Sequence, residues 1–113
     1  MHTYKAKIMH VIDGNTFEAV VDLGFKIYKK AVLKIYDIET ADIFNPSCEA
    51  ELKHGLETKK FIEEIALNKE VLIKISKEED YIADVVLDVD RKGLPITLTN
   101  VLKENGFEKR LEY

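Results

Sequence analysis

The sequence predicts a single small β-rich α+β domain that spans residues 1–113. Apolar and polar residues alternate over five short segments, which is typical of half-buried strands. One longer segment instead repeats its apolar residues at helical spacing, and Gly, Pro, Asn and Asp separate the segments. With 113 residues, 46% of them apolar, the chain can build one core and is too short for two ordinary domains.

The N-terminal third predicts three strands joined by tight turns. The first strand covers residues 4–12, and Asp13-Gly14 predicts a hairpin because both positions tolerate positive φ. The second strand places one apolar side toward the core, and Leu23-Gly24-Phe25 forms the next turn. That apolar side consists of Phe17, Ala19, Val21 and Leu23. The third strand, about residues 26–36, sets Ile27, Ala31, Leu33 and Ile35 on one face and Lys30, Val32 and Lys34 on the other.

The remainder predicts a loop, a helix, two strands and a short final helix. Residues 37–48 form the loop, because Pro46 disfavours helical geometry in the residue before it. A helix follows over about residues 50–67 and ends near Asn68. Its apolar stripe consists of Leu52, Leu56, Phe61, Ile62, Ile65 and Ala66. Strands over 71–75 and 83–89 flank the acidic stretch 77–80, and Thr97 or Thr99 caps a last helix that reaches Glu104.

Charge is distributed unevenly along the chain. The net charge is −4, but residues 1–36 carry a net +3 while the remainder carries −7. Contact with nucleic acid is therefore expected on the N-terminal strands, although an ordinary solvated strand face fits this charge equally well. Cys48 is the only cysteine, so no intrachain disulfide can form. The three histidines, His2, His10 and His54, match no metal or catalytic pattern. They are interpreted as ordinary strand, terminal or helix-surface residues.

No apolar run is long enough to cross a bilayer, and the N-terminus lacks the charged and apolar regions of a signal peptide. These observations favour a soluble cytoplasmic protein that does not contact a membrane.

Two short motifs occur in a defined order along the chain. Asp13-Gly14-Asn15-Thr16 is followed, after a strand pair, by Tyr36-Asp37-Ile38-Glu39-Thr40-Ala41-Asp42. Their frame resembles the staphylococcal nuclease (thermonuclease) family, which typically carries D-G-D-T, an arginine, I-D-T-P-E and a second arginine after a Tyr-Gly step. The resemblance covers about residues 4–107. It implies a five-stranded OB-fold barrel with a helix after the third strand and a short C-terminal helix.

The resemblance also implies a calcium site with altered ligands. The two metal carboxylates of the family fall on Asn15 and Glu39, and the backbone carbonyl that joins them falls on Thr40. Asn15 offers an oxygen without a charge, and Glu39 is one methylene longer than aspartate. Calcium prefers six to eight oxygen ligands, so the expected calcium binding is weak.

The catalytic positions are altered as well. The family's general base falls on Asp42, which is shorter than glutamate, and its first arginine falls on Val32. The second arginine has no counterpart. Lys30 and Lys34 share the strand face of Val32, and with Tyr36 they are expected to contact substrate. A lysine is a point charge and does not reproduce the planar fork by which arginine binds phosphate.

The sequence therefore favours a nuclease-like domain that is catalytically inactive or very weak and binds a nucleotide, single-stranded nucleic acid or a protein. Two alternatives stay open, a calcium-dependent phosphodiesterase with a rearranged site and a purely protein-interaction domain. The chain ends soon after its second helix, where the family domain usually continues. This predicts exposed barrel surface for a partner or a second copy, so both a monomer and a homodimer remain open.

Overall fold

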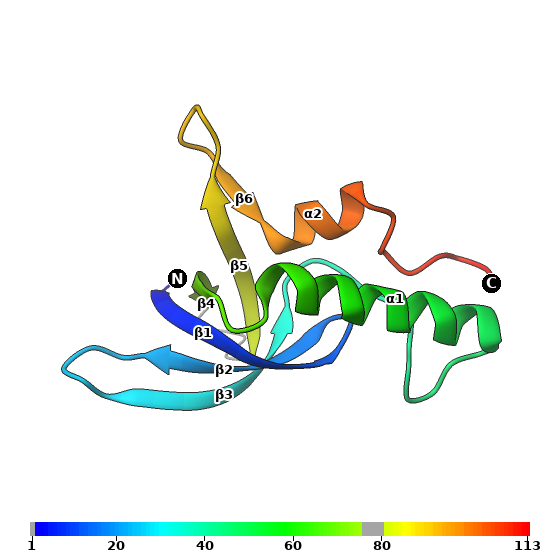
Figure 1. The fold of residues 1–113 in the computed structure, drawn as a ribbon, viewed down its shortest axis with the longest axis horizontal. Coiled ribbons are helices and arrows are strands. Elements are labelled where there is room, and N and C mark those ends of the chain that lie inside the picture. The colour runs from blue at the N-terminus through cyan, green and yellow to red at the C-terminus, as the bar shows by residue number, and fades with distance from the viewer. Residues whose placement is uncertain (1, 76–80) are drawn as a thin grey trace.

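The fold consists of six strands and two helices (Figure 1). The computed structural model describes residues 2–75 and 81–113, and these counts apply to that part of the chain. The strands are β1 (His2–Asp13), β2 (Thr16–Asp22), β3 (Tyr28–Ile35), β4 (Glu70–Ile75), β5 (Ile82–Val89) and β6 (Pro95–Thr97). The helices are α1 (Glu49–Ala66) and α2 (Leu98–Glu104). The predicted β-rich α+β class is confirmed, and the acidic stretch 77–80 lies outside the described residues.

The sheet closes on itself. Neighbouring strands follow the order β3-β2-β1-β4-β5-β6 and pair antiparallel. One additional parallel pairing, Lys34 with Ile82 and Ile35 with Ala83, joins β3 to β5. That pairing closes β1, β2, β3, β5 and β4 into a ring, while β6 continues from β5 outside it.

The core fills this ring, and it follows from the alternation of the strands. In β2, Phe17, Ala19 and Val21 are buried, as predicted, whereas the residues between them are half-buried. The helices contribute Ile62 and Ala66 of α1 and Leu98 and Leu102 of α2. The predicted apolar stripe of α1 is correct toward its C-terminus and wrong at Leu56, which lies half-exposed on the outer face.

The turn between β1 and β2 occurs where the sequence predicts it, for a different reason. Asp13 pairs with Thr16 across the turn, but neither Asp13 nor Gly14 has a positive φ. Glycine is needed at position 14 because a Cβ there would lie 2.6 Å from the Oγ1 atom of buried Thr40. The turn is thus fitted against the loop that carries the second motif.

Both ends of α1 follow from local sequence. The helix begins after Cys48, an exposed N-cap residue, and the chain leaves it at Asn68, whose φ of 63° matches the predicted stop. Thr97 caps α2 by accepting the N–H of Asn100. Neither helix is both long and apolar enough to cross a membrane.

Residues 105–113 fold back onto α1 (Figure 1). Phe107 packs on Phe61 with ring centroids 4.7 Å apart. His54 Nε2 donates to the carbonyl of Gly106 at 2.9 Å, and His54 Nδ1 lies 2.6 Å from the Tyr113 hydroxyl. His54 is only 5% exposed, so its interpretation as a helix-surface histidine is wrong; it joins the tail to the helix.

Replacing Gly55 by alanine is expected to destabilise the protein, although alanine is the better helix former. A Cβ on Gly55 would lie 2.6 Å from Ile43 Cγ2 and 2.7 Å from the backbone oxygen of Ala41. The loop must move to relieve these contacts, so Gly55→Ala should lower the free energy of unfolding by about 1–3 kcal/mol in urea titrations. The exposed neighbour change Glu57→Ala should stay within about 0.5 kcal/mol of the wild type. Equal or greater stability of Gly55→Ala would show that the loop does not pack against α1 in this way.

Candidate functional site

A pocket of about 360 Å³ opens where four segments of the chain meet. The β1–β2 turn, β3, the loop after β3 and the C-terminal tail all contribute to its wall. The lining residues are Asp13, Asn15, Thr16, Lys34, Glu39, Thr40, Ala41, Asp42 and Lys109. We call this the acidic pocket.

The acidic pocket brings together five of the eight predicted site residues. Asn15 comes from the turn, Lys34 from β3, and Glu39, Thr40 and Asp42 from the loop. Asn15 is held in the turn, where its backbone N–H donates to Asp13 Oδ1 at 2.9 Å. The two sequence motifs therefore face one cavity, although 23 or more residues separate Asn15 from the loop segment that it meets.

The other three predicted residues lie elsewhere. Val32 and Lys30 line a neighbouring groove, and the exposed Tyr36 is not among the residues that line either cavity. Its backbone carbonyl accepts the hydroxyl of Thr99 at 2.6 Å, which ties β3 to α2. Lys30 and Tyr36 therefore do not line the acidic pocket, and their expected contact with substrate stays a prediction.

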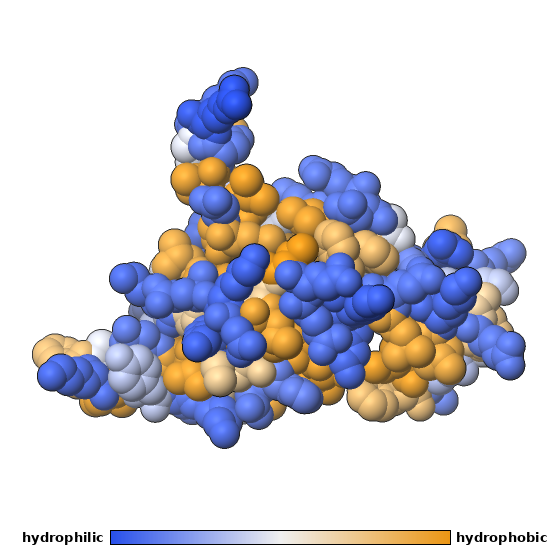
Figure 2. Space-filling model, in the orientation of Figure 1, coloured by the Kyte–Doolittle hydropathy of each residue, from blue (hydrophilic) through white to orange (hydrophobic). Residues whose placement is uncertain are grey.

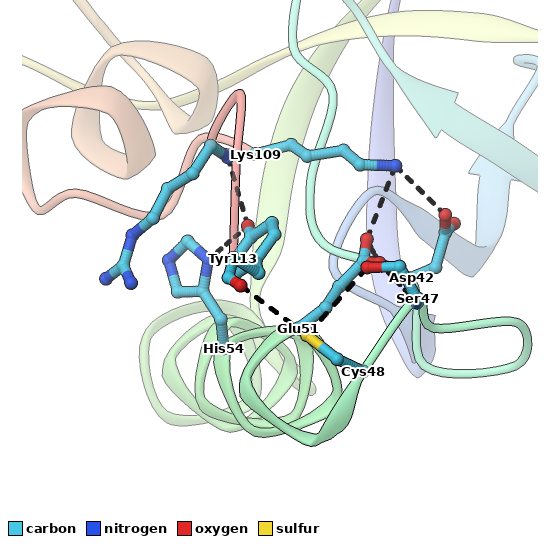
Figure 3. A network of polar contacts seen from close by, with 8 residues as sticks. Asp42, Ser47, Cys48, Glu51, His54, Lys109 and Tyr113 are labelled. Carbon is cyan, nitrogen blue, oxygen red and sulfur yellow. Dashed lines mark hydrogen bonds and ion pairs between the residues drawn. The ribbon is translucent and has the colours of Figure 1, made fainter.

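Sequence reasoning missed Lys109, which supplies a positive charge to the pocket. Its ammonium lies 3.1 Å from Asp42 Oδ2 and 3.3 Å from Glu51 Oε2 (Figure 3). Its backbone N–H donates to the carbonyl of Glu39 at 2.7 Å, so the tail is fixed to the loop at this point. The Asp42 and Glu51 carboxylates raise the pKa of Lys109. No local pattern connects two residues 67 positions apart, and so the sequence carries no signal for this pair.

Sequence reasoning also missed Glu51, whose side chain holds the loop before α1 in place. Its side chain is 2% exposed, and it accepts the backbone N–H of Ser47 at Oε1 (2.7 Å) and of Asp42 at Oε2 (3.0 Å) (Figure 3). These two donors, together with Lys109, hold the pKa of Glu51 at about 2. A glutamate at the third position of a helix commonly reaches back to N–H groups before the helix. That local rule is the signal that could have identified Glu51.

The donor set of the acidic pocket fits a calcium ion poorly. Over residues 2–75 and 81–113, no three His, Cys, Asp or Glu side chains gather closely enough to hold a metal. The carboxylate of Asp42 is already paired with an ammonium, and Asn15 brings no charge. Calcium requires six to eight oxygens, so no chemical step is assigned to a metal here.

Beside the acidic pocket lies a larger groove of about 1150 Å³. Thr16 and Lys34 line both cavities, so the two share part of their walls. We call it the basic groove after the three lysines of β3 that line it, which lie among aliphatic side chains and the rings of His2, Tyr4 and Tyr81. The lining residues are His2, Tyr4, Thr16, Val21, Leu23, Lys29, Lys30, Ala31, Val32, Leu33, Lys34, Ile75 and Tyr81.

Comparison with known proteins leaves the site to be interpreted from its own residues. A scan against protein-family models finds no match to this chain. A search of the curated proteins likewise finds no match.

Glu51 is expected to make stability depend on pH in the acid range. Its folded pKa lies below the ordinary 4.5, so its stabilising contribution is complete above about pH 4.5 and is lost as the pH falls through about 2. Glu51→Gln should therefore lower the melting temperature by at least about 5 °C near neutral pH. The difference from the wild type should shrink as the pH is lowered from about 4.5 to about 2.

Thermal melts of both proteins across this pH range test the expectation, with the exposed Glu57→Gln on the same helix as the control. A wild-type advantage that persists unchanged at the lowest pH would contradict the assignment.

Proposed function

We propose that this chain is an OB-fold domain related to the staphylococcal nuclease family that binds single-stranded nucleic acid and does not cleave it. The observation that carries the proposal is the basic groove, in which Lys29, Lys30 and Lys34 lie with Tyr4 and Tyr81.

The connectivity supports the OB-fold assignment. An OB fold is a five-stranded, partly open Greek-key barrel. The ring order here is β1-β2-β3-β5-β4, and α1 lies between β3 and β4 in the chain. This connectivity is the one that the resemblance implies, with β6 as a short addition.

The groove has the two kinds of side chain that hold a single strand. Lysines attract the phosphate backbone regardless of sequence, and aromatic rings offer flat surfaces on which bases stack. Lys29, Lys30 and the ring of Tyr81 are exposed. OB folds bind oligonucleotides on the face of their second and third strands, and β3 forms much of this groove.

The acidic pocket supports loss of cleavage. A general base must lie within about 3 Å of the water it activates, with its lone pairs available. The Asp42 carboxylate instead holds the Lys109 ammonium at 3.1 Å. Val32 cannot donate to a phosphate, and deletion of one preorganised charge donor typically lowers the rate by about 10²–10³.

Nucleic-acid binding by the groove is expected to fall with salt. Fluorescence anisotropy of a labelled oligo(dT) between about 50 and 200 mM salt should give a log–log slope near −2 if three phosphates are neutralised. The double variant Lys30→Ala/Lys34→Ala should weaken binding and reduce this slope by about 1 or more. Lys60→Ala, an exposed lysine on α1, is the matched control and should leave both unchanged. Salt-insensitive association with a protein partner, without oligonucleotide binding, would instead support a protein-interaction domain.

The wild type is expected not to cleave nucleic acid. Cleavage should appear only when the altered residues of the site are replaced by those that the family carries. The triple variant Asn15→Asp/Val32→Arg/Lys109→Ala adds a ligand charge, restores an arginine and releases Asp42 from its ammonium. With calcium and single-stranded DNA, this variant should exceed the wild type by at least about tenfold in product formation. Robust calcium-dependent cleavage by the wild type, abolished by Glu39→Ala, would refute the proposal and support the phosphodiesterase alternative.

A further inference from the structure

The hairpin between β2 and β3 ends in an exposed apolar tip, residues 23–28. Phe25 is 98% exposed, and Leu23, Ile27 and Tyr28 are 43%, 56% and 62% exposed. The sequence pattern predicted Leu23 and Ile27 on the inner, apolar face, and that prediction is wrong. The hairpin extends from one end of the molecule (Figure 1), beyond the point where the core covers its strands.

The backbone of the tip holds these side chains outward. Gly24, Phe25 and Lys26 have φ values of +85°, +54° and +62° in succession. A positive φ is uncommon for a bulky residue such as phenylalanine, so the turn presents Phe25 to solvent through an unfavourable local geometry.

Three N–H groups of the tip, those of Leu23, Gly24 and Ile27, are bonded within the hairpin. The N–H of Leu23 donates to the carbonyl of Ile27 at 2.9 Å, and the N–H of Ile27 donates to that of Gly24 at 2.9 Å. The N–H of Gly24 donates to Asp22 Oδ1 at 2.8 Å. Groups paired in this way can leave water without losing their hydrogen bonds, which an apolar environment requires.

Positive charge lies close behind the apolar residues. Lys26 is in the turn, and Lys29 and Lys30 follow at the start of β3, against the single acid Asp22. A strand rises about 3.3 Å per residue, so the backbones of Lys29 and Lys30 follow Tyr28, the last residue of the tip, by about 3 and 7 Å along the hairpin. Figure 2 shows hydrophobic and hydrophilic atoms side by side at this end of the molecule.

We propose that the hairpin tip inserts into the surface of an anionic lipid bilayer, with Phe25 at the greatest depth, which departs from the sequence-based expectation of no membrane contact. Side chains that bind the interface enter it by about 5–10 Å, a depth that leaves Lys29 and Lys30 at the level of the lipid phosphates. Nucleic acid shares this negative charge, but Leu23 and Ile27 have no flat surface on which a base could stack. Their transfer from water to hydrocarbon is favourable, and this difference favours lipid as the ligand.

A tryptophan at the tip tests the inference directly. The chain has no tryptophan, so Phe25→Trp introduces the only indole. Its emission should shift to the blue with vesicles containing about 30% phosphatidylserine and should not shift with pure phosphatidylcholine. In flotation assays, Phe25→Asp should weaken binding to the anionic vesicles at least about tenfold. Since Phe25 is almost fully exposed and aspartate tolerates positive φ, this variant should keep the wild-type melting temperature.

Phe44→Asp is the matched control, because Phe44 is also a largely exposed phenylalanine but lies in the loop before α1. It should bind vesicles like the wild type. An equal loss with both aspartate variants, or the absence of a blue shift, would overturn the inference. A blue shift with a single-stranded oligonucleotide and none with vesicles would overturn it too and would assign the tip to nucleic acid.

Discussion

The arrangement of the acidic pocket depends on the interactions of the buried Glu51 carboxylate. It accepts the N–H groups of Ser47 and Asp42, and it pairs with the ammonium of Lys109. One side chain thus joins the first turn of α1, the loop after β3 and the C-terminal tail. A buried charge is strongly unfavourable unless its partners are in place, so the position of Asp42 is coupled to a tail residue that follows it by 67 positions.

This coupling changes what the acidic pocket can do. The carboxylates of Asp42 and Glu51 both pair with the ammonium of Lys109. Their negative charge is therefore balanced by a residue of the same chain and does not require a metal ion or a substrate. The lysines of the basic groove instead lie along β3, in a wall that also contains aromatic rings. The two cavities therefore differ in sign although they adjoin, and the groove is the better place for a polyanion.

Sequence patterns correctly predicted the features that depend on residues close together in the chain. The alternation of Phe17, Ala19 and Val21 and the stop at Asn68 are local, and the structure agrees with both. The ion pairs of Lys109 are set by folding of the whole chain, so no local pattern could reveal them. Alternation also says which side of a strand is apolar without saying where the core ends, which is why Leu23 was misplaced.

Val32 and Lys34 differ in the cavities that they line. Residues 32 and 34 share a face of β3, because side chains alternate along a strand. Lys34 lines both cavities, whereas Val32 lines only the basic groove and is too short to carry a polar group across the boundary. Of the residues of β3, Lys34 alone is therefore part of the wall of both the basic groove and the acidic pocket.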